Sequence, residues 1–421
     1  MIRKSINVVC FIAVLNLCAV DSAVAEFRAG TAKADVTPPI GSRMYGYGAR
    51  GVNVSRGVHD PLFAKAVVLD DGETKVAIVT LDLGSFPKEN TDNVRVIVEK
   101  ETGIENILCV ASHTHSAPRF SEDFPNESMP WVREMERKVA DAIVRADKNL
   151  REARIGVGWG VVREGHNRRM IKPNGEVFMF WENRGRIPTV PLDYSLGVIR
   201  VEDNKGESIA TLVNFACHPV VLGPENLQIS ADYVGAFTRM VEEKLGGQCM
   251  FLQGAPGDIN PFWDKTPPDE GGFEQVEIMG SAVAKGVLDV TGRMGEYFAD
   301  PKLNIHSEVI LLAARNDPAR EKRDIAAPIH TLLIGNDVAL GFFPGEFFVE
   351  HGLALKTQSR FKHTFFVGYT NDALGYFPTI KATTEGGYGA ASATRVEVGA
   401  GERLVNRALI NLYYQLDMIK P

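Results

Sequence analysis

The residues from Ile107 to Arg119, ILCVASHTHSAPR, place the strongest constraint on the fold of this chain. An apolar run of strand type changes within one residue into Ser-His-Thr-His-Ser, so a buried strand is predicted to end on two histidines. Side chains alternate along a strand, which predicts that His113 and His115 point to one face of the sheet. Two imidazoles on one face indicate a metal site, and a histidine-rich turn after a core strand explains the same residues equally well.

The change from an apolar strand to a polar residue recurs further along the chain. Runs of strand type end at His218 in NFACHP, at Asp258 in GAPGDINP and at Glu346 in FPGEF. Predicted strands alternate with predicted helices, which indicates an α/β fold with a mixed central sheet, flanking helices and β-hairpins. Parallel strands place their carboxyl ends on one side, so we expect these residues to share one rim of the sheet. Two imidazoles with one carboxylate match a catalytic zinc shell that leaves room for water or substrate.

The first 25 residues predict export from the cytoplasm. Arg3 and Lys4 precede an apolar run over 6–20, and Ala23-Val24-Ala25 has the small-residue pattern that a signal peptidase reads. We expect cleavage after Ala25 and a soluble periplasmic or secreted protein, because no later run is long enough to span a bilayer. The predicted organisation is a signal peptide over 1–25 and one domain over 26–421. The oligomeric state is left open.

Charge and cysteine usage narrow the class of partner. The chain has 46 lysines and arginines against 53 aspartates and glutamates, a formal net charge of -7. This balance argues against a nucleic-acid surface and fits a small-molecule substrate. Cys109, Cys217 and Cys249 each lie in an apolar run, where a thiol behaves as a small hydrophobe, so a disulfide framework is not expected. The chain also lacks the HExxH and P-loop motifs, and the absence of a GxSxG nucleophile elbow disfavours a serine triad.

An ordered set of short segments resembles a known family. The segments are SHTHSAP, NFACHP, GAPGDINP, FPGEF and NDALGYFPT, the last followed eight residues later by YGAAS. In this order they resemble the catalytic domain of the neutral/alkaline non-lysosomal ceramidases. The opening AGTAKADVTPPIG and the GYG loop also resemble the start of that family. The resemblance extends from Arg28 to about Ser392 and implies a neutral ceramidase-like catalytic domain over 26–421.

The resemblance implies roles for individual residues around one catalytic Zn²⁺ ion. The implied metal ligands are His113, His218, Glu346 and Tyr376. The residues implied to surround the scissile carbonyl, as acid/base and oxyanion partners, are His115, Arg168 and Tyr388. We also expect substrate contacts from Tyr47 in the glycine- and tyrosine-rich loop and from Asp258 and Asn260. A surface loop plugged by aromatic side chains explains the Tyr47 segment as well as a ligand contact does.

Two departures from the family pattern shape the functional hypotheses. The family loop usually reads GDVSPN, and this chain has Asn260 in place of the serine. Full-length members also carry a C-terminal immunoglobulin-like domain, which we do not expect here. The first hypothesis is an exported zinc-dependent amidohydrolase that resembles neutral ceramidase, uses zinc-bound water as nucleophile and acts on a small or lipid-like acylated substrate. The second is a zinc-dependent esterase or deacylase acting on an acylated sugar or another non-sphingolipid. The third is a non-catalytic member that binds a lipid or glycan.

Overall fold

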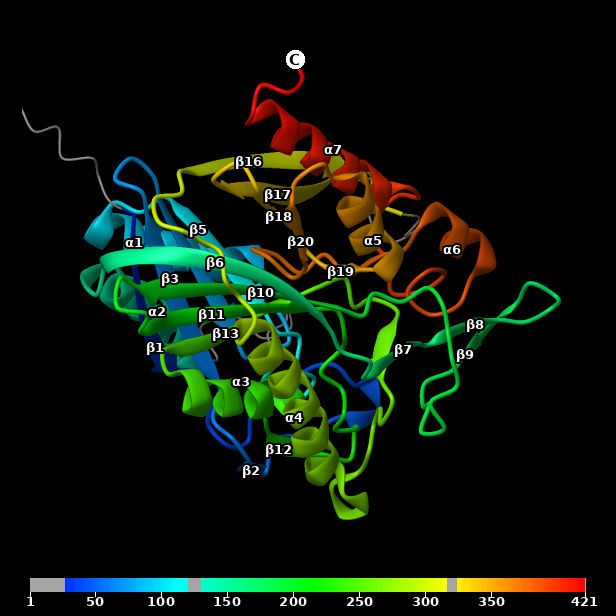
Figure 1. Ribbon diagram of the computed structural model, residues 1–421. Coiled ribbons are helices and arrows are strands. Elements are labelled where there is room, and N and C mark those ends of the chain that lie inside the picture. Colours follow the sequence, from blue (N-terminus) through cyan, green and yellow to red (C-terminus); the bar gives the residue numbers. More distant parts are fainter. Residues whose placement is uncertain (1–26, 120–129, 316–323, 421) are drawn as a thin grey trace, which may run out of the picture.

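A nine-stranded mixed sheet forms the centre of the fold (Figure 1). The structure is a computed structural model that describes residues 27–119, 130–315 and 324–420, so the predicted signal peptide lies outside the described residues. Eight strands follow the order β13-β11-β10-β6-β1-β3-β4-β5, and β15 pairs with β6. The strands are β1 (Arg28–Asp35), β3 (Phe63–Asp70), β4 (Lys75–Leu81), β5 (Asn106–Ala111), β6 (Arg151–Val161), β10 (Ser195–Asp203), β11 (Ser208–Phe215), β13 (Gln248–Gln253) and β15 (Tyr297–Phe298). The predicted mixed α/β fold is confirmed.

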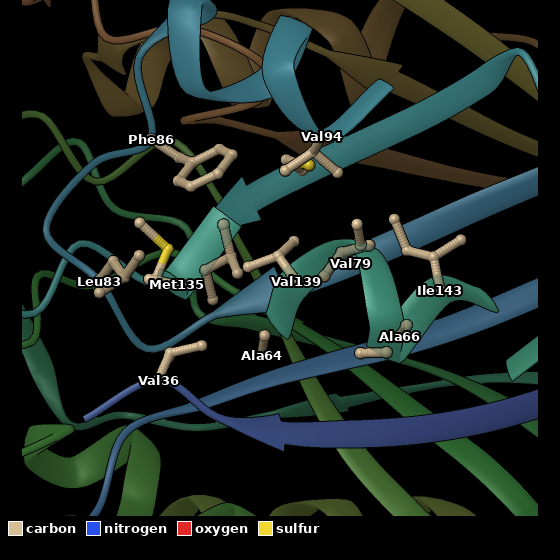
Figure 2. Close-up of a cluster of buried hydrophobic side chains, with 14 of the residues drawn as sticks. Val36, Ala64, Ala66, Val79, Leu83, Phe86, Val94, Met135, Val139 and Ile143 are labelled. Carbon is tan, nitrogen blue, oxygen red and sulfur yellow. The ribbon is translucent and has the colours of Figure 1, made fainter. Parts of the chain in front are cut away.

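The first half of the sheet is built from β1, β3, β4 and β5. The pairs β1–β3 and β3–β4 are antiparallel, and β4–β5 is parallel because α1 (Lys88–Thr102) crosses over between them. Helix α2 (Pro130–Lys148) buries Val132, Met135, Val139 and Ile143, whose spacing of three or four residues forms one apolar stripe. That stripe packs on the sheet in a cluster with Val79 and Val94 (Figure 2). Each such side chain contributes roughly 1.5–3 kcal/mol by burial.

The second half repeats this plan with β6, β10, β11 and β13. The pairs β6–β10 and β10–β11 are antiparallel, and β11–β13 is parallel across α3 (Asp232–Leu245). Helix α4 (Gly272–Thr291) packs against α3. Gly280 permits this contact, because a Cβ there would lie 2.5 Å from the Cβ of Ala236.

The two halves are joined by a short ladder and fold towards each other. Only Arg28↔Glu152 and Ala29↔Arg151 pair β1 with β6. Along the hydrogen-bonded path β5 runs opposite to β11 and β13, so their carboxyl ends would be far apart in a flat sheet. The carboxyl ends of these strands nevertheless meet, because β5 and β13 come into contact. At this contact, Gln253 Nε2 donates to the carbonyls of Ser112 (2.9 Å) and Cys217 (3.0 Å). The expected rim exists, but bending of the sheet creates it and not a shared strand direction.

The C-terminal part of the chain adds a second sheet in the order β16-β17-β18-β20. Its strands are β16 (Leu303–Leu312), β17 (Ile325–Ile334), β18 (Val338–Phe342) and β20 (His363–Val367), and its helices are α5 (Val349–Gln358) and α7 (Ala400–Tyr414). Phe342 and Phe365 share a buried cluster with Ile199 and Leu108 of the large sheet. The second sheet therefore covers one face of the first, and α7 covers the second sheet in turn (Figure 1).

Short ladders connect the loops above the strand ends. They pair β2 (Gly57–Val58) with β12 (Gln228–Ile229), β7 (Gly165–Asn167) with β14 (Ile259–Pro261), β8 (Arg169–Ile171) with β9 (Val177–Met179), and β19 (Glu346–Phe347) with β21 (Tyr376–Phe377). The remaining elements are α6 (Ile380–Glu385) and 3₁₀ turns at Gly48–Arg50 and Pro268–Glu270. The pattern of apolar residues over 347–359 predicts a helix, but α5 starts at Val349 because Glu346 and Phe347 pair with β21. Cys109, Cys217 and Cys249 are buried and free, and no helix among the described residues is long and apolar enough to cross a bilayer.

Candidate metal and active site

His113 lies just beyond β5, where the chain turns away from the sheet. Its backbone φ is 69°, in the left-handed region, so the alternation of a strand no longer applies to it. Its backbone N–H donates to the Leu83 carbonyl (2.9 Å), and its Nδ1 lies 2.7 Å from the Gly84 carbonyl oxygen. A carbonyl only accepts, so Nδ1 carries the hydrogen and the lone pair of Nε2 remains available.

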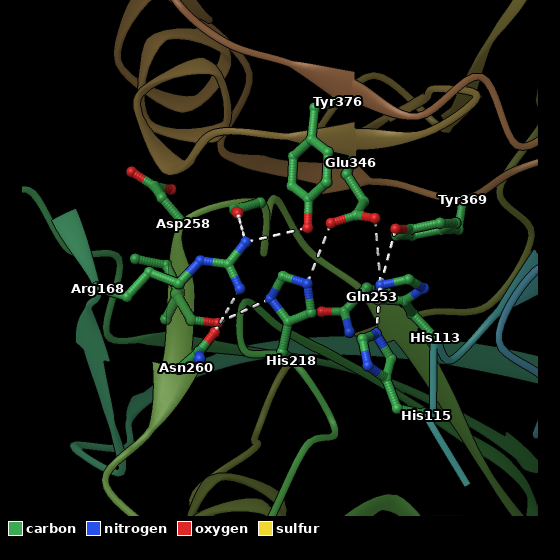
Figure 3. A network of polar contacts seen from close by, with 12 residues as sticks. His113, His115, Arg168, His218, Gln253, Asp258, Asn260, Glu346, Tyr369 and Tyr376 are labelled. Carbon is green, nitrogen blue, oxygen red and sulfur yellow. Dashed lines mark hydrogen bonds and ion pairs between the residues drawn. The ribbon is translucent and has the colours of Figure 1, made fainter. Parts of the chain in front are cut away.

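His115 meets His113 across this turn. The two Nε2 atoms are 3.1 Å apart, and the ring planes stand at 88° (Figure 3). The prediction that the imidazoles lie together is confirmed, but its reason is wrong, because the rings converge through a turn and not along one face of a strand. The two histidines also differ. His115 Nδ1 is buried without a hydrogen-bond partner among the described residues, whereas His113 Nδ1 is fixed by a carbonyl.

His218 and Glu346 complete a cluster around the same point. His218 follows β11 with Nδ1 3.0 Å from the Ile259 carbonyl oxygen, so its Nε2 lone pair is also free. That Nε2 lies 3.1 Å from Glu346 Oε2, and His113 Nε2 lies 3.4 Å from Glu346 Oε1. One donor nitrogen from each of His113, His115 and His218 lies within 4.8 Å of the others. The structure thus brings together three histidines and a carboxylate that the sequence spreads over 234 positions.

Two tyrosines border the carboxylate, one expected and one not. Tyr376 pairs with Glu346 in the β19–β21 ladder, and its hydroxyl donates to the Glu346 carboxylate. Tyr369 was not predicted from the sequence. Its hydroxyl lies 2.9 Å from His113 Nε2, and its ring stacks on that imidazole with centroids 4.0 Å apart. The one sequence signal for Tyr369 is its position directly after the apolar run over 364–368, which has the pattern of a strand.

Burial sets the protonation of the cluster. It lowers the pKa of His113 to about 4 and the pKa values of His115 and His218 well below the usual range. The three rings are therefore neutral near pH 7, the form that binds metals. Burial raises the pKa of Glu346, and it raises the pKa of Tyr376 well above its usual value, to which the neighbouring Glu346 charge adds. A bound cation opposes both upward shifts, so the donor set suits Zn²⁺, which takes nitrogen and oxygen ligands.

Arg168 enters the cluster from the opposite side of Tyr376. Its guanidinium is buried, with Nη2 3.0 Å from the Tyr376 hydroxyl and 2.6 Å from the Gly257 carbonyl oxygen. Nη1 donates to Asn260 Oδ1 (3.0 Å), and Asn260 Nδ2 donates to Asp264 (2.7 Å). Arg168 Nε has no hydrogen-bond partner among the described residues. Asn260, expected to contact substrate, uses both ends of its amide to link Arg168 to Asp264.

Asp258 faces away from the histidines (Figure 3). Its Oδ1 accepts from the backbone N–H of Val349 (2.8 Å) at the start of α5, and its Oδ2 accepts from the Asn167 side chain (2.7 Å). Its own carbonyl accepts from the Arg168 N–H (2.9 Å). Both carboxylate oxygens are therefore committed to the protein, and the structure places Asp258 as a support for the Arg168 loop and for α5. The predicted contact between Asp258 and the substrate stays a prediction, and the geometry of Asp258 does not support it.

Tyr47 and Tyr388 lie at the edge of the cluster. The Tyr47 hydroxyl donates to the Leu222 carbonyl (3.0 Å), and its ring contacts His115 edge-on with centroids 4.9 Å apart. Tyr388 packs edge-on against Tyr376, with centroids 5.3 Å apart, and is 41% exposed. Tyr388 therefore borders solvent next to the cluster, where a substrate can reach it.

With the role that the family resemblance implies for His115, beside the substrate and not on the metal, replacing Gly46 with alanine is expected to reduce turnover about 100-fold and to leave metal content unchanged. Gly46 has a φ of 96°, and a Cβ there would lie 2.3 Å from Cγ of His115, so the imidazole must move. A displacement of about 1 Å in a catalytic group can cost 10²-fold in rate. Gly48→Ala is the matched control, because a Cβ at Gly48 meets nothing within 4 Å. The measurements are steady-state turnover and metal content. Loss of metal from the Gly46→Ala variant would instead make His115 a ligand.

Comparisons with known proteins agree with this geometry. The family model for the N-terminal part of the neutral/alkaline non-lysosomal ceramidases matches residues 27–265. Neutral ceramidase of Drosophila melanogaster is 23% identical over 346 residues, which cover 73% of this chain and 48% of that protein. Neutral ceramidase A of Dictyostelium discoideum is 26% identical over 265 residues, covering 56% and 36% respectively. The chain thus matches about half or less of the length of these curated relatives.

Solved structures share the fold over nearly the whole chain. A structure described as ceramidase complexed with C2 aligns with a TM-score of 0.77 and 18% identity, covering 94% of this chain and 76% of that one. Neutral ceramidase from Pseudomonas aeruginosa aligns with a TM-score of 0.76 and 19% identity, covering 93% and 75%. Identity this low supports the fold alone. The family model, however, spans more than half of the residues, and the chain therefore belongs to the neutral/alkaline non-lysosomal ceramidase family.

Proposed function

We propose that this protein is a zinc-dependent hydrolase of a carboxylic amide bond, of the neutral ceramidase type. One observation carries the proposal. Nε2 of His113 and Nε2 of His218 approach the two oxygens of the Glu346 carboxylate at 3.4 and 3.1 Å, and backbone carbonyls fix both Nδ1 atoms. Carbonyl partners on the second nitrogen orient metal-ligating histidines in many metal sites.

We assign His113, His218, Glu346 and Tyr376 as the residues that hold the ion. Tyr376 belongs to this set because its hydroxyl already lies against Glu346 and Arg168, where a cation favours the phenolate. Zinc in this position supplies a Lewis acid that polarises the substrate carbonyl and lowers the pKa of water to about 7. His115 is left out of the shell, because the absence of a partner on its Nδ1 sets it apart from the two oriented histidines.

His115, Arg168 and Tyr388 are assigned to the chemistry around the carbonyl. Neutral His115 accepts a proton from the attacking water and returns it to the leaving nitrogen, so amide and water give acid and amine. Arg168 retains an unpartnered Nε–H, and its other nitrogens are held by Gly257, Asn260 and Tyr376. Together with the Tyr388 hydroxyl, this fixed cation stabilises negative charge on the carbonyl oxygen.

We base the proposed substrate class, a lipid-like acylated amide, on family membership. We also propose that the catalytic unit spans residues 26–421, and the fold match to a solved ceramidase, which covers 94% of the chain, supports this extent. We further propose that the enzyme acts outside the cytoplasm, because the first 25 residues have the pattern of a signal peptide. Asn260 motivated the alternative of an ester substrate, but its amide is occupied by Arg168 and Asp264, so it does not favour that alternative.

Removing the metal is expected to abolish turnover reversibly. Purified protein, treated with a strong chelator and dialysed, should lose hydrolysis of a short-chain N-acyl sphingosine, and one equivalent of Zn²⁺ should restore it. The same assay run on an acylated sugar and a simple ester separates the amide and ester hypotheses. Turnover of esters alone would contradict the amide assignment. Binding of lipid without turnover of any substrate, at full zinc content, would favour the non-catalytic hypothesis.

A further inference from the structure

A pocket of about 280 Å³ opens beside Glu346 and leads to a cationic side chain that the proposed mechanism does not use. The residues of its wall that matter here are Tyr45, Glu346, Tyr369, Tyr376, Thr394 and Arg395. Glu346, Tyr376 and Tyr369 stand together on one side of the histidines (Figure 3). The pocket therefore shares a wall with the predicted metal site, and a substrate held at that site has room to extend towards Arg395.

The position of Arg395 is fixed by its backbone. Its carbonyl accepts from the Arg315 N–H (2.8 Å), and the next residue, Val396, is buried in the core. The preceding Ala393 carbonyl accepts from the Tyr376 N–H (3.4 Å), which places this segment directly against a predicted ligand. With Val396 anchored inwards, Arg395 projects to the rim of the pocket.

The guanidinium of Arg395 differs from the other arginines near the site. Arg50, Arg168 and Arg169 all donate to carbonyl or side-chain oxygens of the protein. Among residues 27–119, 130–315 and 324–420, no carboxylate pairs with Arg395 and no acceptor takes a hydrogen bond from its side chain. The hydroxyl oxygen of Thr394 is also buried and has no partner among the described residues. Two neighbouring residues that line one pocket thus each carry a donor without an acceptor among the described residues.

We propose that Arg395 and Thr394 form an anion subsite that selects acyl amides bearing a carboxylate, such as N-acyl amino acids. The inference rests on the proposed amide hydrolysis, since it concerns the substrate of the same site. A guanidinium fork and one hydroxyl match the two oxygens of a carboxylate. A phosphate presents three oxygens and nearly two charges, and it usually requires more donors than this pocket supplies. The pocket volume accommodates an amino-acid head group.

The test compares substrates that differ only in the charge. The first pair is N-octanoylglycine, which carries a carboxylate on the amine side of the amide bond, and its uncharged analogue N-octanoylglycinamide. The second pair is the monoethylamide of octanedioic acid, which carries a carboxylate on the acyl side, and its uncharged analogue N-ethyloctanamide. We expect the carboxylate member of one pair to be preferred by the zinc-loaded protein. In Arg395→Gln the ratio of kcat/KM values within that pair should fall about tenfold, as for a partly exposed charge-assisted hydrogen bond. Thr394→Val should reduce it by a smaller factor.

Arg360→Gln serves as the control, because Arg360 is an exposed arginine just after the end of α5 and lines no part of this pocket. It should leave both ratios unchanged. Calorimetric binding of N-octanoylglycine and its amide to wild type and Arg395→Gln decides the subsite even without turnover. If no amide is hydrolysed but the carboxylate binds more tightly through Arg395, the proposed function fails and the subsite stands. Equal binding and equal ratios in wild type and Arg395→Gln would overturn the subsite.

Discussion

Replacing Glu346 with glutamine should remove bound metal and turnover together. Among the described residues, this carboxylate is the only acidic group that pairs with histidines of the cluster, and its two oxygens face His113 and His218. Glutamine keeps the shape and one oxygen, but it cannot offer a negative charge to a divalent ion. Disturbing the residues that merely support a metal ligand costs 10–100-fold, so loss of a ligand should reduce zinc affinity by more than about 100-fold. Metal content after dialysis and turnover of an N-acyl sphingosine are the measurements.

The metal-free forms give the control for folding. Glutamine keeps an oxygen that accepts from the Tyr376 hydroxyl. It also removes a buried carboxylate, and burial already raises the pKa of that Glu346 carboxyl group. The metal-free variant should therefore unfold within about 2 °C of the metal-free wild type. Glu350→Gln, four residues further along the chain and outside the cluster, should retain zinc and activity. Full turnover by a zinc-loaded Glu346→Gln protein would show that the cluster is not the catalytic centre.

Replacing Arg168 with lysine should leave the metal in place and reduce kcat by about 10²–10³-fold. Lysine keeps the charge, but a single ammonium cannot hold Gly257, Asn260 and Tyr376 at once and also present a directed N–H to the substrate. Removing one preorganised donor of this kind typically costs 10²–10³ in kcat. The reduction should fall mainly on kcat, because the interaction strengthens as charge develops on the carbonyl oxygen.

The matched control for Arg168→Lys is Arg200→Lys. Arg200 is also buried and lies in β10, where it pairs with Glu202 away from the histidines. That substitution should affect stability and not kcat. If Arg168→Lys lost zinc in proportion to activity, Arg168 would act by supporting Tyr376 and not through the substrate.

The sequence predicted the helices and strands better than it predicted which distant segments come into contact. The pattern of apolar residues predicts a helix over 232–245, and α3 begins at Asp232 and ends at Leu245, because this periodicity is local information. His113, His218 and Glu346 were predicted to converge, and they do. The bend between β1 and β6 that brings them together depends on long-range packing, and no local pattern records it.

Side-chain direction was the other quantity that the sequence could not supply. Asp258 and Glu346 look alike as acidic residues after apolar runs, yet Asp258 turns towards the N–H of Val349, 91 positions away, and Glu346 turns towards the histidines. The position of Tyr369 after an apolar run did not predict its contact with His113, because that contact depends on a left-handed backbone at both residues. Asn260 was expected at the substrate and instead secures Arg168.

The origin of the cluster in three distant segments has a consequence for how the protein acquires its site. His113 comes from the first half of the large sheet, His218 from the second half, and Glu346 from the segment after β18. A nascent chain that has reached Lys265, where the family match ends, already contains every histidine of the cluster and none of its carboxylate. With the proposed ligands, tight zinc binding would therefore require the chain up to Tyr376, and the ion would stabilise only the form in which these segments are assembled.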